Sequence, residues 1–133
     1  MNGRARGSPS YPGAMLKSLL VAAVAAALLA GSTQAAPHKV TKLYAQAGPG
    51  FKITLKTKAF VPVHSVKRGT YTFVVFDRST IHNFHLKGPG VDKHTSVPFL
   101  GTKTWAKVTL KKGKYNYWCD PHKAQMHGSF TVK

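Results

Sequence analysis

Three side chains that bind soft metal ions stand close together near the end of the chain. Cys119, His122 and Met126 follow one another as Cys-x2-His-x3-Met, so one short loop can supply a thiolate, an imidazole and a thioether. Soft sulfur donors beside imidazole favour copper, and two imidazoles with a thiolate and a weak thioether form electron-transfer copper sites. A second imidazole is therefore needed. His82 is the best candidate, because the amide of Asn83 beside it can brace a loop next to the metal.

The other histidines fit this site less well. His85 lies three residues after His82, on the opposite face of a regular strand, and is expected to be a surface or packed residue. His127 adjoins Met126, yet a surface role is favoured over ligation. Neither His64 nor His94 has a partner at a metal-ligand spacing, and the same holds for His38.

Several other classes of metalloprotein and enzyme are disfavoured by what the chain contains. A binuclear copper centre needs two cysteines, and the chain has one; multicopper oxidases use His-x-His and His-Cys-His elements, which do not occur here. Zinc sites usually take histidine and cysteine without a thioether. With three acidic residues and no suitable Ser-His-Asp arrangement, the sequence predicts a carrier of electrons and no enzyme activity.

The elements that must position these ligands are strands. Residues 51–56 alternate apolar and polar side chains with period two, and residues 70–76 are rich in β-branched and aromatic side chains, which predicts a central strand. In the strand that leads into Cys119, alternation places Tyr115 and Tyr117 on the face of Cys119. A terminal strand is expected over residues 129–132. Short strands with turn-rich joints and no helical period predict a single antiparallel β-sandwich.

Four further expectations concern the middle of the chain. Residues 81–86 are expected to form a strand that places His82 and Phe84 on one face. A loop is expected over residues 88–95, followed by a short edge strand over residues 96–99. In the strand over residues 103–110, simple alternation places Trp105 on the lysine face unless a β-bulge shifts the register, and the sequence leaves both alternatives open.

Taken together, these residues resemble a known family. The segment from Gly113 to His122, with His82-Asn83 before it and Met126 and Gly128 after it, is similar to the small plastocyanin-like and amicyanin-like cupredoxins. The resemblance spans about residues 40–132. It implies a Greek-key β-sandwich that holds one type 1 (blue) copper ion.

The resemblance also implies roles for individual residues. His82, Cys119, His122 and Met126 would be the copper ligands, and Asn83 would connect strand and loop while placing a backbone N–H near the Cys119 sulfur. Pro121 has no N–H to offer, which limits the donors to that sulfur. Trp118 matches a position that small cupredoxins use as an aromatic surface contact, so it is a possible electron-transfer surface; a merely packed tryptophan is the alternative.

An apolar run over residues 19–30, headed by Lys17, predicts a secretory signal, since it is too short to span a bilayer. Either Met1 or Met15 could be the start, and cleavage is expected after Ala35. The chain is therefore predicted to comprise an N-terminal extension and signal over residues 1–35 and one cupredoxin domain over residues 36–133. The mature protein is expected to be exported, periplasmic or extracellular, monomeric and without a membrane span.

The charge is strongly positive. The chain has 20 Lys and Arg residues against three acids, and losing Arg4, Arg6 and Lys17 with the signal leaves a formal charge of +14. Such a protein attracts anionic surfaces, which favours redox partners with an acidic docking surface and indicates no specific nucleic acid. The leading interpretation is a one-electron carrier. The alternatives are a copper storage or delivery protein, and a cationic binder of anionic polymer in which copper is structural.

Overall fold

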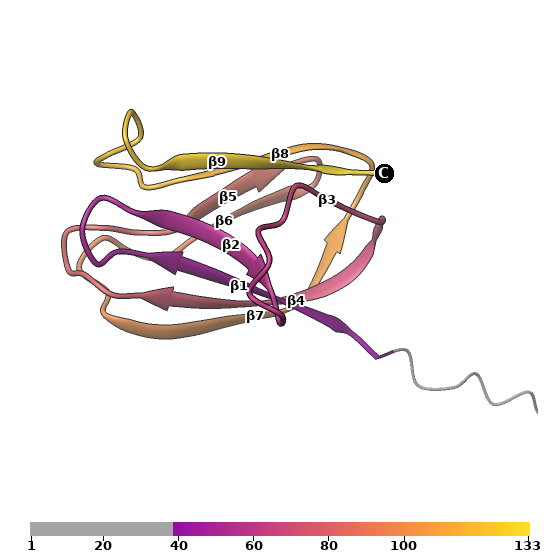
Figure 1. Ribbon diagram of the computed structural model, residues 1–133, viewed down its shortest axis with the longest axis horizontal. Helices are drawn as coiled ribbons and strands as arrows, with labels where there is room; N and C mark the ends of the chain where they lie inside the picture. Colours follow the sequence, from indigo (N-terminus) through magenta and orange to yellow (C-terminus); the bar gives the residue numbers. More distant parts are fainter. Residues whose placement is uncertain (1–38) are drawn as a thin grey trace, which may run out of the picture. The chain divides into compact units, whose positions relative to one another are not determined.

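The computed structural model describes residues 39–133, which form nine strands in two layers (Figure 1). The strands are β1 (Thr41–Ala47), β2 (Ile53–Thr57), β3 (Ser65–Val66), β4 (Gly69–Asp77), β5 (His85–Gly88), β6 (Val91–His94), β7 (Gly101–Leu110), β8 (Gly113–Trp118) and β9 (His127–Val132). The predicted signal segment, residues 1–35, lies outside the described residues. Within residues 39–133, no helix is long and apolar enough to cross a membrane.

The two sheets form the predicted β-sandwich. One sheet has the strand order β2-β1-β4-β7, and the other has the order β3-β9-β8-β5-β6. Most neighbours are antiparallel, but β1 pairs with β4 and β3 pairs with β9 in parallel. The prediction of an all-β Greek-key sandwich is confirmed, with the correction that both sheets are mixed because β1 and β3 return beside strands distant in the sequence.

The core follows from period-two alternation on the facing sheets. In β4, the inward positions Tyr71, Phe73 and Val75 are buried while the residues between them are partly exposed. Opposite them, the buried rings of Tyr115 and Phe130 stack with their centroids 5.3 Å apart. Burying each such side chain contributes about 1.5–3 kcal/mol, so the aromatic core gives the loops at the sandwich end a rigid base.

The prediction of a strand over residues 81–86 is wrong, since β5 (His85–Gly88) begins only at His85. His82, Asn83 and Phe84 precede it in an irregular segment, and all three are buried instead of alternating. The reason is a set of tertiary hydrogen bonds to this segment, described below, which replaces the bonds of a strand ladder.

The prediction of a loop over residues 88–95 is also wrong. Residues Val91–His94 form β6, which pairs antiparallel with β5 in a tight hairpin that places His85 opposite His94. The turn consists of Pro89 and Gly90, and Gly90 adopts a φ of 73°, a value that glycine reaches without strain. No edge strand forms over residues 96–99.

The two alternatives for Trp105 are resolved by an irregularity in β7. The register between β4 and β7 shifts between Tyr71 and Phe73, and Lys107 adopts a positive φ of 54°. Trp105 is consequently buried together with Val108, while Ala106 is exposed. The bulge therefore turns the tryptophan inward, where it packs against Phe73 with ring centroids 6.4 Å apart.

Three connections gather at one end of the sandwich, on the left in Figure 1: the β1–β2 turn, the β4–β5 connection and the β8–β9 loop. They carry Phe51, His82 and His122 respectively, whose rings lie within 5.5 Å of one another between centroids. This end of the sandwich is where the predicted ligands meet.

Candidate metal centre

The structure brings together three of the predicted ligand atoms from two distant segments. Nδ1 of His82 lies 3.0 Å from Nδ1 of His122, and the Sγ atom of Cys119 lies 3.7 Å from the former and 3.6 Å from the latter. Nitrogen and sulfur bind first-row metal ions at about 2.0 and 2.3 Å, so one ion can reach all three atoms. His82 and Cys119 are buried, whereas His122 is partly exposed.

The tight loop between β8 and β9 positions two of these donors. The backbone N–H of His122 donates to the carbonyl of Cys119 over 3.1 Å, and the N–H of Met126 donates to the carbonyl of His122 over 2.8 Å. The N–H of Cys119 closes the loop by donating to the Met126 carbonyl over 3.0 Å. These bonds fix the spacing of the Cys-x2-His-x3-Met motif.

Met126 completes the donor set predicted from the sequence. Its side chain is fully buried at the base of the loop, and its backbone is bonded to both Cys119 and His122. A buried methionine is often only core filler. Here the loop closure places it next to two metal-binding residues, which suits a weak thioether ligand.

Asn83 holds the two ligand-bearing segments together. Its backbone N–H donates to Cys119 Sγ over 3.4 Å, as the resemblance implies, and its side-chain amide donates to the Thr95 carbonyl over 3.0 Å and to Asp120 Oδ2 over 2.6 Å. In return, the backbone N–H of Asp120 donates to Asn83 Oδ1 over 2.7 Å. Asn83, which follows the ligand His82, and Asp120, which follows Cys119 in the thiolate loop, are thereby joined by hydrogen bonds in both directions.

A second network anchors the same segment to both sheets. The Thr95 hydroxyl accepts a hydrogen bond from the Phe84 backbone N–H over 3.0 Å and donates to Asp77 Oδ2 over 2.9 Å. Burial raises the pKa of Asp77, and the hydrogen bond from Thr95 only partly offsets this effect. Asp77 ends β4 and Thr95 follows β6, so the network fixes the His82 segment between the two sheets.

Sequence reasoning missed Phe51, which lies against both histidines. Its ring centroid is 5.5 Å from that of His82 and 5.0 Å from that of His122, in edge-to-face orientations, and the residue is 56% exposed. The turn that delivers it needs Gly48 at a φ of 71°, where a Cβ atom would come within 3.3 Å of His82 Cδ2. The Gly-Pro-Gly turn was visible in the sequence, but the approach to the ligands depends on the packed fold.

Asp120, also missed, connects the loop to the outer face of the sheet. Its Oδ1 atom accepts from Trp118 Nε1–H over 2.7 Å and lies 2.8 Å from Nδ1 of His85. Burial by itself would raise the pKa of Asp120, but hydrogen bonds from Asn83, His85 and Trp118 hold it below its ordinary value. An ionised carboxylate therefore sits at the centre of this cluster.

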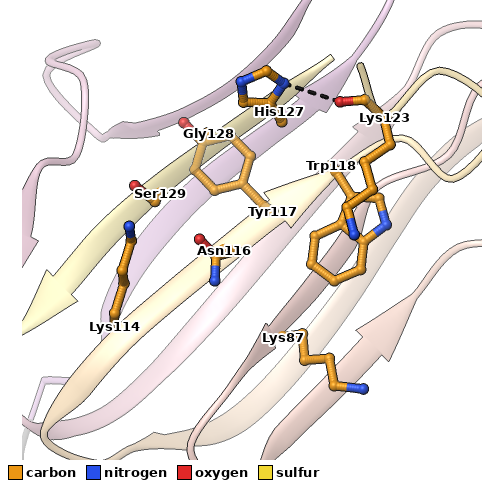
Figure 2. A pocket seen from close by; sticks show the side chains of 9 residues that line it. All are labelled: Lys87, Lys114, Asn116, Tyr117, Trp118, Lys123, His127, Gly128 and Ser129. Carbon is orange, nitrogen blue, oxygen red and sulfur yellow. Dashed lines mark hydrogen bonds between the residues drawn. The ribbon is translucent and has the colours of Figure 1, made fainter. Parts of the chain in front are cut away.

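Among the described residues, His85 and His127 are not part of this group of three donors. His85 is 16% exposed at its side chain, and its ring packs against Trp118 with centroids 4.4 Å apart and an angle of 33° between the ring planes, which agrees with the predicted surface or packed role. The exposed His127 has its Nδ1 atom 2.9 Å from the Lys123 carbonyl. Figure 2 shows this bond at the rim of a groove beside Trp118, with the Lys123 ammonium 4.3 Å from the tryptophan ring centroid.

The donor set fits one type 1 copper ion, as the sequence predicts. Two imidazole nitrogens and one cysteine sulfur form a triangle, and the thioether of Met126 is buried in the same loop. This combination is the one that type 1 copper uses, whereas structural zinc sites take no thioether.

Comparison with known proteins agrees with this description. Residues 19–132 match the family model described as a cupredoxin-like domain, and because the match covers most of the chain, the protein belongs to the cupredoxin-like family. Among curated proteins, none matches the chain in sequence.

Solved structures to which this chain is similar include rusticyanin and amicyanin. Reduced rusticyanin is 21% identical, with a TM-score of 0.48 over 69% of this chain and 78% of that chain. A methionine-to-glutamine variant of amicyanin in the Cu(I) form is 18% identical, with a TM-score of 0.46 over 70% of this chain and 83% of that chain.

Proposed function

We propose that this protein is an exported one-electron carrier with a type 1 copper site formed by His82, Cys119, His122 and Met126. The observation that carries the proposal is the convergence of two imidazole nitrogens and the Cys119 sulfur within 3.7 Å of one another. Bound copper would supply a one-electron couple between Cu(I) and Cu(II). The protein is proposed to act as a carrier without enzyme activity.

The residues around the ligands limit how far the donor atoms can move. Asn83 bonds to the Cys119 sulfur and to Asp120 on the thiolate loop, and Thr95 ties the His82 segment to Asp77. Small ligand movements lower the energy needed to reorganise the site when its charge changes. A constrained thiolate site therefore suits electron transfer better than copper delivery, which requires ligand exchange.

The geometry offers electrons two exits. His122 is the partly exposed ligand, and the exposed ring of Phe51 lies 5.0 Å from it between centroids, which gives a partner an apolar contact at the copper edge. Trp118 offers the second exit. It immediately precedes Cys119 in the chain and borders the groove in Figure 2, beside the cationic side chains of Lys87, Lys114 and Lys123.

The positive charge points to acidic redox partners. Long-range attraction can raise encounter rates about 10- to 1,000-fold, and screening removes most of it as the Debye length falls from about 30 Å at 0.01 M salt to about 8 Å at 0.15 M. Reduction by an anionic small donor should therefore slow with added salt, and reduction by a cationic donor should accelerate. Flat profiles for both donors would place the charge away from the electron exits.

The experiment that tests the carrier role combines three measurements on one copper-loaded sample. A carrier should show a reversible one-electron wave, fast electron self-exchange and slow loss of copper to a chelator. A storage or delivery protein should instead release copper readily and exchange electrons slowly. A cationic polymer binder with structural copper should show neither fast self-exchange nor copper release.

A further inference from the structure

A second group of metal-binding side chains lies on the outer face of the β5–β6 hairpin. Nε2 of His85 is 2.7 Å from Oδ1 of Asp92, and one donor atom from each of His85, Asp92 and His94 lies within 4.8 Å of the other two. The sequence spacing alone gave His94 no partner. The hairpin register supplies one, because His85 and His94 stand directly opposite each other and their ring centroids are 5.0 Å apart.

Strand geometry explains why the three side chains share one face. Asp92 and His94 are two residues apart in β6, so both project from the same side of the edge strand. His85 is the cross-strand neighbour of His94 and the diagonal neighbour of Asp92, and both positions are within reach across a sheet. The backbone of a short, tight hairpin therefore fixes the spacing of the donors.

Asp120 orients the central histidine of this group. Its Oδ1 atom lies 2.8 Å from His85 Nδ1, which leaves Nε2 as the nitrogen that faces Asp92. Histidines that bind metal almost always donate their other ring N–H to a carboxylate or carbonyl, an arrangement that sets the tautomer and the ring orientation. The ring of Trp118, with its centroid 4.4 Å from that of His85, packs against the histidine from the β8 side.

We propose that His85, Asp92 and His94 form a second, surface metal site that binds a divalent first-row transition-metal ion such as Zn²⁺. Two imidazoles and one carboxylate are the ligand types that Zn²⁺ accepts, with a fourth position left for water. The site differs from the copper centre in having no sulfur donor, so it favours borderline divalent ions over Cu(I). An ion bound at this site would lie between Nε2 of His85 and the carboxylate of Asp92, which are 2.7 Å apart.

Lys87 would compete with a bound metal ion for the carboxylate of Asp92. Its ammonium forms an exposed ion pair with Asp92 Oδ2 at 3.0 Å, while Oδ1 of the same carboxylate faces His85. Removing the lysine charge should therefore strengthen ion binding, whereas removing Asp92 should weaken it. Opposite effects from two neighbouring substitutions would not follow from a purely structural role of this cluster.

The test is a Zn²⁺ titration followed by NMR of the imidazole nitrogens, which resolves each histidine separately. The copper site is first filled with Cu(I), and every sample carries His38→Asn so that an imidazole near the N-terminus does not bind the same ion. The resonances of His85 and His94 should shift together and saturate at one ion. Because His82 and His122 are read separately, failure of the copper assignment would be visible without affecting this result.

Three variants decide the outcome. Asp92→Asn should lower the Zn²⁺ affinity tenfold or more, and Lys87→Gln should raise it about two- to fivefold, the range expected for an exposed ion pair. His64→Asn removes another exposed imidazole and should change nothing. Absence of a shift at millimolar Zn²⁺, or equal affinity in the wild type and Asp92→Asn, would overturn the proposal.

Discussion

Replacing Asn83 with alanine should destabilise the domain while leaving the copper ligands in place. The substitution removes three side-chain hydrogen bonds, two with Asp120 and one to the carbonyl of Thr95. The buried Thr95 carbonyl is left without that partner, which costs about 1–3 kcal/mol. Each bond with Asp120 contributes about 0.5–1 kcal/mol, because the side chain of Asp120 is 42% exposed and water can replace part of the interaction.

The expected decrease in the free energy of unfolding is therefore about 2–5 kcal/mol, a large share of the 5–15 kcal/mol of a typical domain. Urea unfolding of the copper-free protein, followed by tryptophan fluorescence, measures this decrease. The backbone N–H that bonds to Cys119 Sγ is retained in Asn83→Ala. The copper-loaded variant should accordingly keep its visible absorption while unfolding at lower urea.

Asn116 provides a matched control. It is exposed on β8, and Asn116→Ala should change the free energy of unfolding by no more than about 0.5 kcal/mol. If Asn83→Ala loses less than about 1 kcal/mol, or no more than the control, the bracing role assigned to Asn83 is wrong.

Three further predictions concern the ligands and the buried acid. Met126→Gln should retain copper but lower its reduction potential by on the order of 60 mV or more, since an oxygen donor that favours Cu(II) tenfold shifts a one-electron couple by that amount; an unchanged voltammogram would remove Met126 from the site. His82→Ala should lose the blue absorption and His85→Ala should keep it, and the reverse result would move the ligand. The raised pKa of Asp77 means that the folded state holds its proton more tightly than the unfolded state, so stability declines as pH rises from about 4 through the folded pKa. Asp77→Asn removes this dependence, and urea unfolding at pH 4 and pH 7 should favour the variant more at pH 7; an equal difference at both values would contradict the assignment.

The loop that carries Cys119 could be predicted in detail because its determinants are local. Alternation places Tyr115 on the inner, buried face of β8, and the same alternation continues to the buried Cys119 directly after the strand. The short spacing from Cys119 to Met126 then defines a tight turn. These features depend on neighbours in the sequence. The sequence therefore identified both the thiolate and the direction from which its strand approaches.

The segment around His82 could not be predicted in the same way. Residues 81–86 are compatible with a strand, and only the hydrogen bonds that join Thr95 to Phe84 and to Asp77 show that the segment is irregular up to His85. Those partners are 11 and 18 residues away from Thr95 in the sequence. Period-two alternation does not predict contacts between residues that are so far apart in the sequence.

Two other features, one that the sequence left open and one that it did not reveal, have comparable causes. The inward turn of Trp105 depends on a bulge at Lys107, which has no distinctive residue to signal it. The contact of Phe51 with both histidines depends on how the β1–β2 turn meets the thiolate loop across the sandwich end. In each case the deciding interaction forms only after the two sheets have packed.

The measurement that tests the central assignment most directly is the visible spectrum of the Cu(II)-loaded protein compared with Cys119→Ser. Cys119 Sγ lies 3.6–3.7 Å from both imidazole nitrogens, so the wild type should show an intense thiolate-to-copper charge-transfer band. The serine variant, which lacks the sulfur, should show none. A band of unchanged position and intensity in Cys119→Ser, or its absence from a wild type that has bound Cu(II), would contradict the assignment.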